Sequence, residues 1–135
     1  MDTRWKPEYE VGHPRIDSEH QVFLDLIEQF TSEAARGVDA KRLSRHCAEL
    51  YKYADFHFFS EEGLLESVGY NDLEGHKRLH ADLLKSLRIF IESISIDSIM
   101  ADEMAEFLLG WFVNHTTAED PKHIHFLPKT SPYNR

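Results

Sequence analysis

The chain has 135 residues, a length near the commonest size of one domain. Its hydrophobic share of 41% and charged share of 29% are ordinary for a globular protein, so we expect a single domain over residues 1–135. The formal net charge of −9 argues against a nucleic-acid partner and against an anionic membrane surface, because both favour lysine and arginine.

Helical periodicity runs through most of the chain and predicts four long helices between two irregular ends. Residues 1–16 contain two prolines and a glycine, and they form an irregular N-terminal arm. Asp17 or Ser18 can cap a first helix that ends near Arg36, just before Gly37.

Three further helices follow at short intervals. Their expected bounds are near Asp39 to about Ser67, about Asn71 to Ser93, and Ile96 or Asp97 to Glu119. Short connections between long helices favour antiparallel neighbours, which predicts an all-α, up-down-up-down four-helix bundle over residues 17–120. Residues 121–135 contain three prolines, cannot continue as helix, and form a C-terminal tail.

The single cysteine, Cys47, excludes an internal disulfide and is expected to be an inert core residue of the second helix. The first residues lack any apolar stretch resembling a secretion signal. No run approaches the roughly 20 apolar residues of a membrane span. We therefore expect a cytoplasmic protein without a membrane partner.

Seven residues in four clusters form a candidate site for two metal ions. They are His20; His57 with Glu61; His76 with His80; and His115 with Asp120. Imidazole suits iron, copper, zinc or nickel, whereas calcium and magnesium sites are built mostly from oxygen donors. The two pairs that are four residues apart lie one turn apart on one helix face, where they can chelate an ion.

The spacing of His115 and Asp120 needs a separate explanation. On a regular helix an offset of five turns the second side chain roughly 140° away from the first. Pro121 disfavours the helical conformation in the residue before it, so the helix should end at or just before Asp120. The carboxylate can then fold back toward the core.

A purely structural role is the alternative for each cluster taken alone. A histidine pair at this spacing often lies on a surface, and a helical His–Glu pair is usually just hydrogen bonded. All seven residues, however, lie on the apolar sides of their helices, where burying ionisable groups is costly unless they are paired or bind metal. The joint pattern therefore favours a dinuclear metal site.

This ligand set, in this order along four helices, resembles the hemerythrin family, and especially its bacterial single-domain and sensor-domain members, over roughly residues 5–120. Trp5 matches an aromatic residue of the family's arm, and Ile16 with Asp17 matches the Ile-Asp before its first ligand. The resemblance implies a three-histidine iron held by His76, His80 and His115, and a two-histidine iron held by His20 and His57. Glu61 and Asp120 would bridge both ions.

The same resemblance implies two iron ions (Fe2+/Fe3+) with a bridging oxo or hydroxo group, and reversible binding of O2 at the iron that keeps an open position. A protein with such a site can be an oxygen carrier or store. It can also be an oxygen or redox sensor that acts on a signalling effector or redox partner. The alternative is a di-iron enzyme acting on peroxide or nitric oxide, but we expect no enzyme, because no further acid–base residue is aimed at the pocket. A dinuclear zinc hydrolase is disfavoured, since the H-E-x-x-H motif is absent. The oligomeric state is left open.

We expect O2 to bind beside residues near the ligands, namely Phe23, Phe58, Trp111, Phe112 and Thr116. Ordinary core packing is the alternative for the aromatic residues. The position of Thr116 is commonly isoleucine in the family, so its hydroxyl could hold a water and speed autoxidation. The competing interpretation is that this hydroxyl donates to a backbone carbonyl one turn earlier.

The remaining glutamates and histidines are assigned to the surface or to helix capping, or are left without an assigned role. We expect a solvated surface for Glu28, Glu33, Glu62 and Glu66, and we expect Glu62 to point roughly 100° away from Glu61 on the helix, too far to reach the ions. His46 is assigned a capping or surface role, and no role is assigned to His13, His123 and His125.

Overall fold

The computed structural model describes residues 2–94 and 99–119, apart from the side chains of residues 94, 99–101, 118 and 119. Every regular element that it describes is helical. In chain order these are η1 (Pro7–Tyr9), α1 (Pro14–Ala35), α2 (Ala40–Ser67), α3 (Leu73–Ile94), α4 (Ile99–Asn114) and the π-helical turn η2 (His115–Glu119). Asp120 and the expected tail lie outside the described residues.

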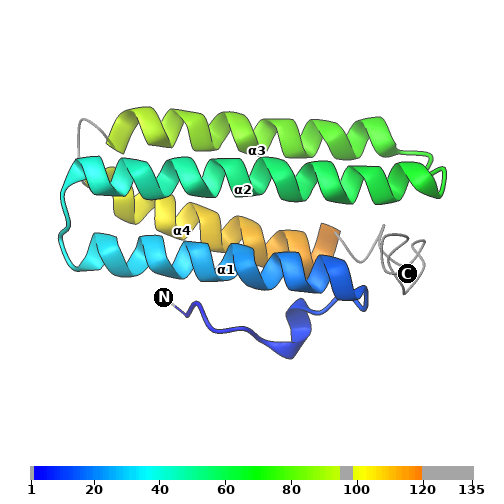
Figure 1. Cartoon of the computed structure of the whole chain (residues 1–135), viewed down its shortest axis with the longest axis horizontal. Coiled ribbons are helices and arrows are strands. Elements are labelled where there is room, and N and C mark those ends of the chain that lie inside the picture. Colours follow the sequence, from blue (N-terminus) through cyan, green and yellow to red (C-terminus); the bar gives the residue numbers. More distant parts are fainter. Residues whose placement is uncertain (1, 95–98, 120–135) are drawn as a thin grey trace.

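The four long helices form an antiparallel bundle, which confirms the expected fold class (Figure 1). Helix α1 packs against α2 and α4, and α3 packs against the same two helices. Among the described residues, no helix combines the length and apolarity needed to cross a membrane.

The first helix begins earlier than the sequence predicted. His13, not Asp17 or Ser18, is its N-cap: the His13 Nδ1 accepts a hydrogen bond from the Ile16 backbone N–H at 3.3 Å, and Pro14 occupies the first helical turn. The Asp17 carboxylate instead accepts from the backbone N–H groups of Val11 at 2.8 Å and Gly12. It therefore ties the N-terminal arm to α1 by its side chain.

The second helix begins where the sequence predicted, and Asp39 is its N-cap. Asp39 precedes α2 and accepts a hydrogen bond from the Arg42 backbone N–H at 2.9 Å. Gly37 and Gly69 follow α1 and α2 with φ of 73° and 69°, a conformation that glycine adopts without the cost of a Cβ atom. Local signals therefore set these two helix ends.

The arm packs onto the end of the core that lies near the candidate ligands. Tyr9 is buried, and its ring meets those of Trp5 and Phe112 edge to face at 5.5 Å and 5.3 Å. Phe112 in turn lies 5.9 Å from the ring of His20. The arm runs beside α1 in Figure 1. Tyr9 thereby packs against the ring that neighbours His20.

Candidate metal centre

Six of the seven predicted ligands come together inside the bundle. One comes from α1 (His20), two from α2 (His57 and Glu61), two from α3 (His76 and His80), and one from the first residue of η2 (His115). All six are buried. Asp120 lies outside the described residues, so its part in the cluster stays a prediction.

Glu61 lies at the centre of the cluster. One ligand atom each from Glu61, His20, His57 and His115 lies within 4.8 Å of the others, and Glu61 forms a second such group with His76 and His80. Its Oε1 contacts the Nε2 atoms of His76 and His80, and its Oε2 lies 3.4 Å from the Nε2 of His57. A single carboxylate is therefore shared by two groups of potential metal ligands.

The position of His115 does not select one partition of the predicted ligands. The distance grouping places it with His20 and His57, whereas the family resemblance placed it with His76 and His80. Its ring centroid is 5.6 Å from that of His20 and 5.7 Å from that of His80. Because these separations are nearly equal, the geometry is compatible with both partitions.

The electrostatics of Glu61 fit a site for cations. Burial alone would raise the pKa of this carboxyl, but hydrogen bonds and charge from His115, with further hydrogen bonds from His76 and His80, outweigh burial and hold it well below its usual range. Burial lowers the pKa of His57 and so favours the neutral imidazole that a metal requires. The cluster thus presents a carboxylate whose pKa is lowered beside a histidine, His57, whose pKa is also lowered.

Two buried atoms of the cluster have only long contacts with other described residues, at 3.4 Å and 3.5 Å, instead of a hydrogen bond of ordinary geometry. They are the Oε2 of Glu61 and the Nε2 of His80. Leaving such groups without partners costs about 1–3 kcal/mol each, and the cost is offset if they ligate an ion. Nitrogen-rich donors of this kind suit a transition metal rather than calcium or magnesium.

The end of α4 departs from a regular α-helix at His115. Helix α4 ends at Asn114, and the next five residues, His115–Glu119, form the π-helical turn η2. The i→i+5 bonding of a π-turn widens the helix, so residues five apart come closer to alignment than on an α-helix. The expected single helix running to Glu119 is therefore corrected at its last turn.

Aromatic rings surround the six described ligands. Phe58 stacks on His80 at 3.9 Å with an interplanar angle of 6°, and Trp111 stacks on His115 at 4.4 Å and 15°. Phe23 lies 6.3 Å from the ring of His57 and packs against Trp111. The structure thus places all four predicted aromatic pocket residues, Phe23, Phe58, Trp111 and Phe112, beside ligands.

Thr116 is fully buried, but its hydroxyl does not reach toward the histidines. The Oγ1 donates to the backbone carbonyl of Phe112 at 3.0 Å, with the carbonyl of Val113 at 3.3 Å. This is the alternative that the sequence left open. The hydroxyl hydrogen is therefore donated to the helix backbone, and the effect of Thr116 on autoxidation stays a prediction.

Two glutamates that the sequence did not assign to the site bind the outer nitrogens of predicted ligands. Glu19 Oε1 lies 2.8 Å from His57 Nδ1, and Glu62 Oε2 lies 2.7 Å from His80 Nδ1. The expectation that Glu62 belongs to the solvated surface is wrong, because α3 packs beside it. No local spacing signals either contact, since the partners are 38 and 18 residues apart in the chain.

Two of the remaining assignments also change. Glu33 is buried rather than solvated, and its carboxylate pairs with the Arg42 guanidinium at 2.7 Å. His46 is half-buried and lies 3.4 Å from Glu33.

Cys47 is buried as expected, and burial raises the pKa of its thiol to about 12. Glu33, His46 and Cys47 lie toward the other end of α1 and α2 from the candidate ligands.

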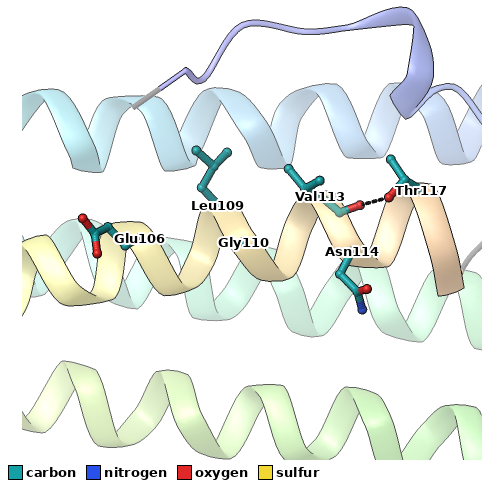
Figure 2. A pocket seen from close by; sticks show the side chains of 6 residues that line it. All are labelled: Glu106, Leu109, Gly110, Val113, Asn114 and Thr117. Atoms are coloured by element: carbon teal, nitrogen blue, oxygen red, sulfur yellow. Dashed lines mark hydrogen bonds between the residues drawn. The ribbon is translucent and has the colours of Figure 1, made fainter.

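A groove of about 610 Å³ lies on the outer face of α4 (Figure 2). Its lining residues are Glu106, Leu109, Gly110, Val113, Asn114 and Thr117. None of these is a predicted ligand or a predicted pocket residue. Two of the lining residues are hydrogen bonded: the Thr117 hydroxyl donates to the Val113 carbonyl at 2.6 Å. The candidate metal centre therefore lies in the core and not in this open hollow.

A bundle whose helices direct a buried histidine and carboxylate cluster inward defines a metal-binding four-helix protein. The family model of the Hemerythrin HHE cation binding domain matches residues 11–123. The chain belongs to the hemerythrin family, which binds a non-haem di-iron centre.

Named relatives agree with this membership. A bacteriohemerythrin of Clostridium acetobutylicum is 30% identical over 125 residues, which cover 89% of this chain and 97% of the relative. A myohemerythrin of Theromyzon tessulatum is 26% identical over 89% of both chains. A bacteriohemerythrin of Pseudomonas aeruginosa is 24% identical over 89% of this chain and 78% of the relative. These are names of hemerythrins and not of enzymes, in agreement with the expectation that the chain is not an enzyme.

Proposed function

We propose that this chain holds two iron ions and binds O2 reversibly, as a carrier or store or as an oxygen or redox sensor. The observation that carries the proposal is the position of Glu61, which is shared by two groups of potential ligands. The proposed ligands are His20, His57, Glu61, His76, His80, His115 and Asp120. A di-iron centre, when bound, supplies two electrons to a small ligand and takes them back when the ligand leaves.

The residues of the chain supply the surroundings for this chemistry. Phe58 and Trp111 stack directly on two proposed ligands, and Phe23 and Phe112 pack around them, so apolar surface borders the site. Such packing excludes water and protons, which would otherwise drive loss of a reduced oxygen species from the site. We assign these four aromatic residues and the buried Thr116 to the O2 pocket.

The donor set supports binding over oxidation of a substrate. Five imidazoles and two carboxylates carry fewer negative charges than the glutamate-rich sets of other di-iron bundles. Fewer anionic ligands make the high-valent metal states that oxidise substrates harder to reach. An enzyme acting on peroxide or nitric oxide would use the same residues, so turnover, and not metal content, separates the two proposals.

The test is metal content combined with the optical spectrum of the dithionite-reduced protein before and after exposure to air. We expect two irons per chain and a visible charge-transfer band that appears with O2 and disappears when O2 is removed. Catalytic consumption of peroxide or nitric oxide would favour the enzyme, and zinc, or fewer than one metal per chain, would contradict the proposal.

A matched pair of variants separates the site from general effects of losing a histidine. His76→Ala removes an imidazole in contact with Glu61 and should abolish the O2-dependent band. His46→Ala removes a half-buried imidazole paired only weakly with Glu33 at 3.4 Å, and it should leave iron content and spectrum unchanged. Equal effects of the two variants would count against the proposed ligands.

A further inference from the structure

A glutamate lies behind one histidine of each group of potential ligands. His57 belongs to the group that contains His20 and His115, and its Nδ1 lies 2.8 Å from Glu19 Oε1. His80 belongs to the other group, and its Nδ1 lies 2.7 Å from Glu62 Oε2. Each proposed metal position therefore has one histidine whose far nitrogen is bound to a carboxylate.

Glu19 is held firmly in this position. Glu19 is 8% exposed. Its Oε2 accepts hydrogen bonds from the Ser60 hydroxyl at 2.8 Å and from the Arg15 guanidinium at 3.1 Å. The Tyr53 hydroxyl also donates to the Glu19 backbone carbonyl at 2.9 Å. Three donors from α1 and α2 thus hold the carboxylate and its helix turn against His57.

These contacts decide which imidazole nitrogen faces the centre. An ionised carboxylate only accepts hydrogen bonds, so the Nδ1 atoms of His57 and His80 carry the hydrogen. In a neutral ring the Nε2 then keeps its lone pair. The Nε2 of His80 lies 3.5 Å from Glu61 Oε1, and that of His57 lies 3.4 Å from Glu61 Oε2. The His57 Nε2 also lies 3.1 Å from the His20 Nε2, another predicted ligand atom. Both Nε2 atoms therefore face the shared carboxylate and the other candidate ligands, where the ions would lie.

We infer that Glu19 and Glu62 are positioning residues of the metal centre that fix Nε2 of His57 and His80 as the ligating atoms and add negative charge that favours the ferric over the ferrous state. The inference rests on the proposed function, since it concerns the same ions. A carboxylate that accepts from a metal-bound imidazole makes that imidazole a stronger donor. Two additional anionic groups offset the low charge of a histidine-rich donor set and favour the more highly charged metal ion.

The two glutamates should not contribute equally. The Glu19 side chain is 10% exposed and binds three donors, whereas the Glu62 side chain is 19% exposed and binds His80 alone among the hydrogen bonds described for it. Solvent weakens the field of a carboxylate, and a single contact leaves more rotational freedom. We therefore expect the larger effect from changes at Glu19.

The variants Glu19→Gln and Glu62→Gln remove the charge and keep the size of the side chain. The matched control is Glu33→Gln, because Glu33 is also 8% exposed, lies on the same helix, and pairs with Arg42. It is fourteen residues from Glu19, roughly 21 Å along α1. The control therefore loses a comparable ion pair without touching the candidate centre.

Two measurements on the metal-loaded proteins test the inference. In competition against a chelator, the affinity for two Co2+ ions should fall by roughly 10–100-fold in Glu19→Gln, by less in Glu62→Gln, and not at all in Glu33→Gln. In spectroelectrochemical titration of the iron form, the midpoint potential should rise in the two site variants only. A loss of Fe3+ affinity about tenfold greater than the loss of Fe2+ affinity corresponds to a rise of about 59 mV for a one-electron step.

A third measurement needs no variant. In the zinc-loaded wild-type protein, imidazole nitrogen NMR shifts should show Nε2 bound to metal and Nδ1 protonated for both His57 and His80. Coordination through Nδ1 at either residue would overturn the inference even if a variant failed to fold.

The possible outcomes separate the inference from the proposed function. If the wild type binds two irons and both site variants match Glu33→Gln in affinity and potential, the positioning role is wrong and the proposed function stands. If the wild type does not bind two metals, the proposed function and this inference both fail.

Discussion

A substitution of Thr116 tests whether its hydroxyl affects autoxidation at the proposed O2 pocket. Its Oγ1 donates to the Phe112 carbonyl at 3.0 Å, and the residue is 0% exposed. The change Thr116→Val replaces this hydroxyl with a methyl group of similar shape. Because the hydroxyl binds the helix backbone, we expect the autoxidation rate of the oxygenated protein to stay within about twofold of wild type, a difference of only ~0.4 kcal/mol in activation free energy.

The effect of this change on stability follows from two opposed contributions. Losing the hydrogen bond costs about 0.5–1.5 kcal/mol. Burying one more methyl group offsets about 0.8 kcal/mol. The free energy of unfolding should therefore change by less than about 1 kcal/mol. Thr116→Ile adds a further carbon to a side chain with no free surface, so it should cost about 1–3 kcal/mol by overpacking.

The assays are the decay of the oxygenated spectrum in air and urea denaturation followed by circular dichroism. Thr117→Val is the control, because the Thr117 hydroxyl donates to a similar carbonyl, that of Val113, from an exposed position. If Thr116→Val slows autoxidation about tenfold while the control does not, a barrier change of about 1.4 kcal/mol, then the hydroxyl does hold a water near the ligands and our reasoning is wrong.

Two further predictions concern buried residues outside the proposed ligand set. Burial lowers the pKa of His13, so the folded state favours the neutral ring, and acid below the ordinary value of 6.5 stabilises the unfolded chain. His13→Asn keeps a capping side chain, and it should remove a pH dependence of up to about 1.4 kcal/mol per pH unit from the free energy of unfolding below that pH. The measurement is urea denaturation of the variant and the wild type at pH 5.5 and at pH 7.5. If the difference between their free energies of unfolding is the same at both pH values, the prediction is wrong. Burial also raises the pKa of the Cys47 thiol to about 12, so roughly one thiol in ten thousand is ionised near pH 8, and a thiol reagent should label Cys47 only after denaturation. Rapid labelling of the native protein would show that this part of the core opens readily.

The sequence alone predicted the elements that local rules control. Gly37 correctly marked the end of the first helix and Asp39 the start of the second, because a glycine with positive φ and a side-chain cap act within a few residues. His57 with Glu61, and His76 with His80, lie together in the cluster as expected, because an offset of four returns a side chain to the same helix face. The ligand order along four helices was also sufficient to indicate the family.

Tertiary packing decided the features that local rules do not reach. Glu62 looked like a surface residue on its own helix, yet the register between α2 and α3 places it 2.7 Å from His80 Nδ1. Glu19 contacts His57 only because the antiparallel helices α1 and α2 pack with the turns that carry these two residues side by side. Helix spacing is intrinsic to one segment, whereas the relative rotation and register of two helices depend on how all their side chains pack together. That dependence is why the chain's own pattern identified the candidate ligands, while only the folded bundle revealed the carboxylates behind them.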